Sequence, residues 1–247
     1  MTTRMVCITG GTRGIGKAIA SRFAQPGTKL ILTYLVDQDA ARATYEELRG
    51  HCDGVEIVQA DMADTEELAQ RLIQPLSSAG AHLDVLVNNA AMGVFRPLDA
   101  LSAKHWDVTQ NACVRGPWFL TTRLAPLMVG GAVVNVSSLG SGRVVPCYGA
   151  VGVAKAALES LTRYLAVELG PLGIRVNGVA GGTVATSALD THPGRKDLLD
   201  AARSRTVSGE PVTPDDIAEA VWFLTQPGAR MIRGQVLVVD GGLTLSA

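Results

Sequence analysis

The sequence predicts a single doubly wound α/β domain, in which helices cover both faces of a seven-stranded parallel sheet. Three observations lead to this fold class. Short β-branched runs alternate with longer helical patterns along the chain. Hydrophobic residues make up 47% of the 247 residues and aromatic residues only 4%, which suits buried parallel strands of Val, Leu, Ile and Ala. A glycine-rich turn lies between the first strand and the first helix.

The expected elements follow one another along the whole chain. The strands are short aliphatic or β-branched runs, at residues 5–9, 29–34, 55–60, 83–88, 132–137, 174–179 and 235–239. The helices are the longer patterns that follow them, at residues 14–25, 37–50, 65–79, 105–128, 148–169, 196–204 and 214–225. Because helices separate the strands, the strands should run parallel, and right-handed crossovers make the sheet doubly wound.

The chain is expected to form one domain over residues 1–247, because no linker, low-complexity tract or internal repeat interrupts the pattern. One long irregular stretch, residues 180–211, contains only a short helical segment. Such a connection is usually functional, and in a doubly wound sheet it lies beyond the carboxyl ends of the strands, where ligands bind. We therefore interpret residues 183–212, approximately, as a substrate lid.

Charge and composition argue against several other classes of protein. The formal net charge of −1 lacks the basic excess of a nucleic-acid-binding protein. There is no signal-peptide pattern, and no apolar stretch reaches the roughly 20 residues of a membrane span. The four cysteines have neither metal-type nor disulfide-type spacing, so we expect reduced thiols, no metal site and a cytoplasmic location.

The glycine-rich turn is the first candidate binding motif. It reads Thr9-Gly10-Gly11-Thr12-Arg13-Gly14-Ile15-Gly16 and opens the first helix. Free N–H groups and the positive end of the helix dipole can hold a pyrophosphate there. We expect cofactor contacts from Gly10, Thr12, Arg13, Gly14, Ile15 and Gly16. The alternative is an ordinary glycine-rich turn between strand and helix.

The end of the second strand indicates which dinucleotide would bind. NAD-binding folds often place an acidic residue there, to hold the ribose 2′-OH. This chain has Thr33-Tyr34-Leu35, with no acidic residue before Asp37. Arg13 could bind a 2′-phosphate, beside Tyr34 at the adenosine end. The pattern favours NADPH rather than NADH, although Arg13 could also be a solvated surface residue.

Further motifs follow the other strands in order. They are Asp61-Met62 after the third strand, Asn88-Asn89-Ala90-Ala91 after the fourth, Asn111 in the next helix, Ser137-Ser138 after the fifth strand, Lys155 in the helix beyond it, and Gly182-Thr183-Val184-Ala185-Thr186 after the sixth. In order and spacing, this set resembles the classical short-chain dehydrogenase/reductase family over essentially the whole chain.

The resemblance implies a role for each of these positions. Cofactor contacts are implied for Asp61, Met62, Asn88, Ala90, Gly182, Val184, Thr186 and Lys155, and catalysis for Ser138, a tyrosine, Lys155 and Asn111, with Asn111 supporting a proton-relay water. Each position has a structural alternative: Asp61 could cap a helix, Asn88 and Asn89 could satisfy backbone groups at a strand end, and Asn111 could bond within a helix contact.

One position departs from the usual family pattern. The residue four before the lysine is normally tyrosine, but here it is Val151, which cannot donate a proton. The nearest tyrosine is Tyr148, seven residues before Lys155. In a helix this spacing puts the two Cα atoms about 10 Å apart along the axis, against about 6 Å for a four-residue spacing. Tyr148 could instead be a structural residue at the start of the helix.

The displaced tyrosine suits a particular reduction. When an α,β-unsaturated thioester is reduced at its β-carbon, negative charge develops on an oxygen three bonds away, so the proton donor must stand farther from the nicotinamide. The Tyr-x6-Lys spacing also resembles the NADPH-dependent enoyl-acyl-carrier-protein reductase III group, as do residues 137–141, 151–169 and 231–235 and the pair Gly181-Gly182.

We therefore expect reduction of an enoyl thioester, on acyl carrier protein or coenzyme A, with Tyr148 and Lys155 as the catalytic pair. Lys155 should lower the pKa of Tyr148. Two alternatives remain: a ketone or imine reductase of a biosynthetic pathway, and a non-catalytic NADP-binding sensor or structural subunit.

Expectations about partners are coarser. Basic lid residues could meet an acidic carrier protein or a coenzyme A phosphate, or could form a solvated helix face; they are Arg195, Lys196, Arg203 and Arg205. Family resemblance implies a homotetramer, paired through the helices of Asn111 and Lys155 and through the last strand, where small residues such as Gly116, Ala156 and Ala157 permit close packing.

Overall fold

The computed structural model describes residues 3–245 and confirms the predicted fold class. Seven strands form one sheet in the order β3-β2-β1-β4-β5-β6-β7, and every neighbouring pair is parallel. The strands are β1 (Arg4–Ile8), β2 (Thr28–Tyr34), β3 (Gly54–Gln59), β4 (Val85–Asn88), β5 (Ala132–Ser138), β6 (Arg175–Gly181) and β7 (Val236–Val239). The order reverses between β1 and β4, which is where doubly wound sheets bind ligands.

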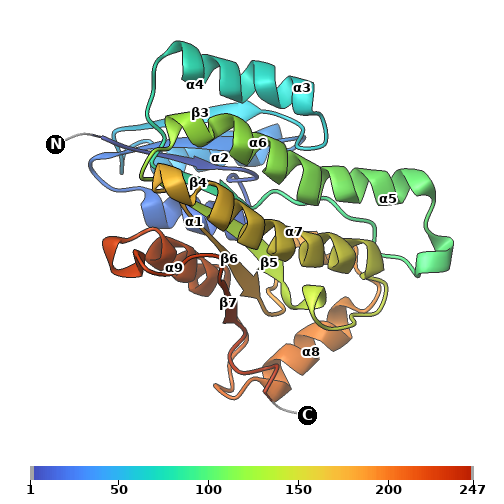
Figure 1. Cartoon of the computed structure of the whole chain (residues 1–247). Helices are drawn as coiled ribbons and strands as arrows, with labels where there is room; N and C mark the ends of the chain where they lie inside the picture. Colours follow the sequence, from blue (N-terminus) through green and yellow to red (C-terminus); the bar gives the residue numbers. More distant parts are fainter. Residues whose placement is uncertain (1–2, 246–247) are drawn as a thin grey trace.

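Helices cover both faces of this sheet. They are α1 (Gly14–Phe23), α2 (Gln38–Leu48), α3 (Thr65–Leu68), α4 (Gln74–Ser78), α5 (Ala103–Gln110), α6 (Gly116–Leu124), α7 (Gly149–Glu168), α8 (Arg195–Arg205) and α9 (Pro214–Leu224). Figure 1 shows α6 and α7 in front of the sheet and α1 and α9 behind it. Among the described residues, no helix is long and apolar enough to cross a membrane.

Two of the expected long helices are interrupted by π-helical segments. These segments are Ala69–Ile73, between α3 and α4, and Asn111–Arg115, between α5 and α6. A proline follows each one, Pro75 in α4 and Pro117 in α6. Proline lacks an N–H group, and its ring clashes with the carbonyl four residues earlier in a regular α-helix. The wider π turn accommodates that ring, and such turns are frequent at functional sites.

The core has two layers, one on each side of the sheet. Val6 and Ile8 of β1 pack toward α1 and α9, whereas Cys7 packs toward α6 and α7. Strand side chains alternate in this way because successive Cβ atoms point to opposite faces. The mostly aliphatic core therefore holds both helical layers against the sheet.

A chain of buried polar side chains ties the two central strands to the helices in front of them. The Asn88 amide donates to Thr121 of α6 at 3.0 Å and to Asn135 of β5 at 2.8 Å. The Asn135 amide in turn donates to Thr162 of α7 at 2.8 Å. These bonds fix α7, which carries the candidate catalytic lysine, against β5.

The Asn135→Ala variant should lose about 2 kcal/mol of unfolding free energy. The substitution removes two hydrogen bonds and leaves the buried partners of Asn135, which are Asn88 and Thr162, without them. Urea denaturation measures this. Ser204→Ala is the control: it removes an exposed bond on α8 and should cost less than about 0.5 kcal/mol. Equal costs for the two variants would contradict a structural role for the polar chain.

Candidate active site

A cavity of about 910 Å³ lies at the carboxyl ends of the strands. The loops after the first six strands and the start of α7 contribute to its wall. The loop after β6 includes residues 183–212, which the sequence analysis interprets as a lid and which are called the lid segment below. Most of the predicted site residues line it: Gly10, Thr12, Arg13, Gly14, Ile15, Gly16, Tyr34, Asp61, Met62, Ala90, Ser138, Tyr148, Lys155, Gly182, Val184 and Thr186. The parallel sheet thus brings together side chains from segments more than 170 residues apart in the sequence.

Asn88 does not line this cavity, and its expected contact with the cofactor stays a prediction. It is the last residue of β4 and is 2% exposed, with its amide bonded inward to Thr121 and Asn135. The next residue, Asn89, lines the cavity instead. Its amide donates to the carbonyls of Thr9 and Gly10, at 2.9 and 3.1 Å. Asn89 therefore holds the glycine-rich loop against the end of β4.

Asn111 also lies outside the cavity wall. It begins the π-helical segment, and its carbonyl accepts a bond from the Gly116 N–H group. Its neighbour Ala112 lines the cavity, and the segment packs against α7. The structure thus places Asn111 behind the wall, at a non-α-helical turn, and its relay role stays a prediction.

The glycine-rich loop has the geometry of a phosphate cradle. Gly10 has a φ of +62°, which residues with side chains rarely adopt. A Cβ at Gly16 would overlap the carbonyl of Gly10 and lie 2.6 Å from the Asn89 amide, so the start of α1 can approach the loop only with glycine there. The free N–H groups at the start of α1 then face the cavity, where they can bind a phosphate.

At the adenosine end of the cavity, the carboxylate of Asp37 already has a structural role. Asp37 caps α2, and its carboxylate accepts the Ala40 N–H group at 3.0 Å. Arg13 is exposed, lines the cavity and occupies the N-cap position of α1. The Arg13 guanidinium is therefore in place to bind a ribose phosphate, whereas the Asp37 carboxylate is bonded to the backbone of α2.

Lys155 is a buried cation at the centre of the site. The side chain is 4% exposed, and its Nζ donates to the Val136 carbonyl of β5 at 2.7 Å. Burial lowers the pKa of this ammonium, whereas Glu159, one turn further along α7, raises it. An ammonium has three donors, so two remain for a ligand in the cavity that Lys155 lines. A buried donor facing a cavity fits the hydroxyl groups of a ribose.

Tyr148 occupies the N-cap position of α7 rather than the helix itself. Its ring lies directly on Gly140, where an added Cβ would be 2.5 Å from ring atom Cε1. Phe95, in the loop after β4, stacks on the same ring with centroids 5.7 Å apart and planes 11° apart. The backbone of Gly140 and the Phe95 ring therefore fix the plane of the tyrosine.

The position four residues before Lys155 is closed to a proton donor. Val151 is 5% exposed and does not line the cavity. Its side chain fills the space beside Gly93 so closely that a Cβ on that glycine would overlap it. Val151 is thus a packing residue, and Tyr148 supplies the phenol of the cavity.

Burial raises the pKa of Tyr148, and hydrogen bonding with Ser138 acts in the opposite direction. The Ser138 hydroxyl accepts the Gly140 N–H group at 3.2 Å, so its own proton can be donated to the phenol oxygen. The expectation that Lys155 lowers this pKa is wrong for the structure as it stands, because the group that lowers it is Ser138. The thiol of Cys113, also buried nearby, raises it further.

Three residues of the site escaped the sequence analysis: Phe95, Gly140 and His192. His192 belongs to the lid segment, lines the cavity and packs on Phe95 with ring centroids 5.0 Å apart. Nothing in the local sequence marks Phe95 or His192, because their role depends on contacts between distant segments. Within residues 3–245, no group of His, Cys, Asp and Glu side chains could hold a metal ion.

Comparison with known proteins extends these observations. The family model described as "Enoyl-(Acyl carrier protein) reductase" matches residues 10–244. The chain is 36% identical over 248 residues to the 1-cyclohexenylcarbonyl-CoA reductase of Streptomyces collinus, covering 97% of this chain and 86% of that protein. It is 35% identical over 250 residues to the (2S)-[(R)-hydroxy(phenyl)methyl]succinyl-CoA dehydrogenase subunit BbsD of Thauera aromatica, covering 99% and 98%.

A solved structure shows the same fold over nearly the whole chain. It is a short-chain dehydrogenase from Burkholderia cenocepacia in complex with NADP, with a TM-score of 0.86 and 35% identity, and the match covers 98% of each chain.

The Ser138→Ala variant should raise the pKa of Tyr148 further, because it removes the hydroxyl that stabilises the phenolate while burial is unchanged. Titration of ¹³C-labelled tyrosine by NMR measures this without a substrate. Ser141→Ala, in the same 3₁₀ turn, is the control and should leave the Tyr148 titration in place. An unchanged titration in Ser138→Ala would show that the two hydroxyl groups do not interact.

Proposed function

This chain belongs to the short-chain dehydrogenase/reductase family, and from that premise we propose that it reduces the α,β-double bond of an enoyl thioester with NADPH. The observation that carries the proposal is the place of Tyr148: it lines the cavity from the start of α7, while the usual tyrosine position is a buried valine. The description of the matching family model and the name of the Streptomyces collinus relative support the same reaction type.

The chain is an NADP(H)-dependent oxidoreductase. The glycine-rich loop, the Arg13 side chain and the buried Lys155 ammonium fit the pyrophosphate, the ribose phosphate and the ribose hydroxyls of that dinucleotide. The NADP complex of the Burkholderia cenocepacia relative supports the same cofactor. When bound, NADPH supplies a hydride for the β-carbon of the substrate.

The residues of the chain account for the remaining steps. As a hydride adds to the β-carbon, the double-bond electrons move toward the thioester oxygen. Tyr148 donates a hydrogen bond or its proton to that oxygen. When the α-carbon takes a proton from solvent, the thioester carbonyl re-forms and any proton on its oxygen returns to Tyr148. Ser138 holds the phenol through its hydroxyl, and Lys155 holds the ribose hydroxyls with its two remaining donors. In this proposal Asn111 supports the water that returns a proton toward the site.

The acyl end of the cavity is apolar. Its wall includes Phe95 from the loop after β4, Leu139 and Val144 from the loop after β5, and Leu189 and Leu198 from the lid segment. Such a wall fits a hydrocarbon acyl group, which gains from leaving water.

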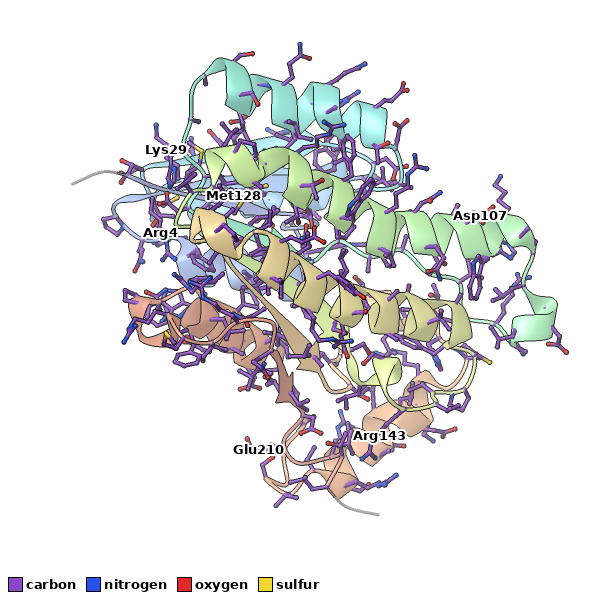
Figure 2. The ribbon with its side chains drawn as sticks, in the orientation of Figure 1. Arg4, Lys29, Asp107, Met128, Arg143 and Glu210 are labelled. Atoms are coloured by element: carbon purple, nitrogen blue, oxygen red, sulfur yellow. The ribbon has the colours of Figure 1, made fainter. Side chains whose placement is uncertain are left out.

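The carrier group would leave the cavity past basic residues. Arg143 and Arg205 both line the cavity, and Figure 2 shows Arg143 beside the lid helix α8. Arg143 also donates to the Thr244 carbonyl, and Arg195, another basic residue of the lid segment, is paired with Asp190 at 3.0 Å.

Exposed apolar side chains favour assembly of the chain into a homotetramer. Trp118, Tyr164 and Val167 are 47%, 67% and 77% exposed on α6 and α7, and Phe223 and Met231 are 44% and 76% exposed beside β7. Apolar groups gathered on two faces indicate two interfaces, which is the number that a tetramer with dihedral symmetry needs. Light scattering measures the mass of the assembly, which should be that of four chains.

Carbonyl reduction is the second candidate. The Ser138–Tyr148 contact beside Lys155 could also protonate a ketone oxygen, and the Thauera aromatica relative is named a dehydrogenase. The two candidates differ in the atom that receives hydride.

A substrate panel distinguishes the two candidates. We expect the protein to oxidise NADPH rapidly with crotonyl thioester, on coenzyme A or on carrier protein, and at least about 100-fold more slowly with acetoacetyl thioester, because the proton donor is displaced from a ketone oxygen. Activity with the keto substrate and none with any enoyl substrate would overturn the proposal in favour of carbonyl reduction. Tight NADPH binding without turnover of either would favour the non-catalytic alternative.

The Gly140→Ala variant should lower kcat by about 10- to 100-fold, because the added methyl group displaces the Tyr148 ring. NADPH binding, measured by fluorescence titration, should stay intact. Gly142→Ala is the matched control: nothing lies within 4 Å of its added Cβ and its φ of −113° suits alanine, so kcat should be unchanged. Equal kcat values for the two variants would contradict the placement of Tyr148.

The Arg13→Ala variant should weaken NADPH binding by about 10-fold or more and leave NADH binding nearly unchanged, because only NADPH carries the 2′-phosphate. Isothermal titration with each dinucleotide measures this. A parallel loss for both dinucleotides would show that Arg13 does not read the phosphate.

A further inference from the structure

The turn that precedes Tyr148 holds an unusual backbone conformation. The Tyr148 N–H group donates to the Val145 carbonyl at 3.2 Å, which closes a four-residue turn. Pro146 and Cys147 occupy its two central positions. Among the described residues, Cys147 is the only one with a side chain and a positive φ, which is +59°. Proline followed by a residue of positive φ is the pattern of a type II turn.

The same four residues could also form a type I turn, which competes with the observed type II turn. A type II turn prefers glycine at its third position, and a residue with a Cβ there pays a conformational cost. Flipping the central peptide, between Pro146 and Cys147, converts type II into type I, in which Cys147 would have an ordinary negative φ. The flip reverses the direction of the Pro146 carbonyl. Some contact on that carbonyl must therefore hold the turn in its observed state.

The contact comes from His192 in the lid segment. Its Nε2 lies 3.0 Å from the Pro146 carbonyl oxygen, and its Nδ1 accepts the Gly194 N–H group at 3.0 Å. Because Nδ1 is the acceptor, Nε2 carries the proton and donates it to Pro146. The histidine is 4% exposed, so this bond is shielded from water. The same ring packs on Phe95, which stacks on Tyr148.

We propose that His192 is a positioning residue for Tyr148. Its Nε2–H group donates to the Pro146 carbonyl and thereby stabilises the strained turn that places the tyrosine at the N-cap of α7. This bond couples the conformation of the lid segment to that of the turn before Tyr148, since it joins residue 192 to residue 146. Opening the lid breaks this bond, releases the turn and withdraws Tyr148 from its place. The kinetic part of the proposal rests on the proposed enoyl reduction, whereas the turn itself can be measured without it.

Two substitutions separate the two hydrogen bonds of His192. His192→Gln places an amide N–H group as many bonds from the backbone as Nε2, so it can still donate to Pro146. His192→Asn places its amide oxygen where Nδ1 stands, so it can accept from Gly194 but cannot reach Pro146. Both lose the ring contact with Phe95, and each keeps one hydrogen bond and loses the other, so the variant that keeps its activity shows which bond positions Tyr148. We expect His192→Asn to lower kcat about 10-fold or more with unchanged NADPH affinity, and His192→Gln to keep kcat within about threefold.

A double-mutant cycle with Cys147→Gly tests the strain directly. Glycine adopts the positive φ without cost, so the turn no longer needs the histidine. We expect Cys147→Gly to restore most of the kcat that His192→Asn loses. A side chain that served only to pack the lid would show no such rescue.

Amide hydrogen exchange provides the readout that needs neither substrate nor cofactor. The Tyr148 amide and the amides of residues 187–194 should exchange faster in His192→Asn than in the native protein or in His192→Gln. Equal exchange in the two variants, both folded by circular dichroism, would overturn the proposal. If the native protein reduces no enoyl thioester while the exchange difference persists, the proposed function fails and the positioning role stands.

The imidazole ¹⁵N NMR spectrum of the native protein tests the bond without any variant. We expect a proton on Nε2 of His192, because Nδ1 accepts the Gly194 N–H group. A proton on Nδ1 would exclude donation to Pro146 and overturn the proposal, even if both variants failed to fold.

Discussion

The buried ammonium of Lys155 is the interaction on which the site depends. Removing a cation from water costs several kcal/mol unless polar groups surround it, and here one backbone carbonyl of β5 accepts its bond while Glu159 stabilises its charge. That bond fixes the face that α7 turns toward the sheet. With α7 held by Lys155 and by the Asn88–Asn135–Thr162 chain, its first residue comes to the carboxyl ends of β5 and β6, where the cavity lies.

The place of the phenol follows from this constraint. Position 151 faces Gly93 and is filled by a valine, so the helix presents no proton donor one turn before Lys155. The phenol comes instead from the turn before the helix, where Gly140, Phe95 and Ser138 define its plane and its hydrogen bond. A donor displaced in this way suits an oxygen remote from the carbon that receives hydride. The same displacement places the phenol in a turn rather than in the helix, and His192 contacts that turn at the Pro146 carbonyl.

Much of this organisation could be predicted from the sequence. Every strand lies within two residues of its expected bounds, because buried parallel strands are short aliphatic runs that glycine and helical patterns delimit. Tyr148 and Lys155 could be chosen as site residues from the family resemblance and their spacing, and both line the cavity. The sequence could not show that Asn89 rather than Asn88 lines the cavity. A one-residue shift at a strand end decides whether a side chain faces the interior or the cavity. The π-helical turns before Pro75 and Pro117 were also missed, as were Phe95 and His192, whose roles arise from contacts between segments distant in the sequence.

The central claim is that Tyr148 is the proton donor for enoyl reduction. Its most direct test follows NADPH absorbance with crotonyl thioester in the native protein, in Tyr148→Phe and in Tyr164→Phe, a control on the exposed face of α7. The account predicts rapid oxidation by the native protein and by Tyr164→Phe, and a loss of about 100-fold or more in Tyr148→Phe with NADPH binding intact. Full activity in Tyr148→Phe, or no oxidation by the native protein even with longer enoyl chains on a carrier protein, would contradict it.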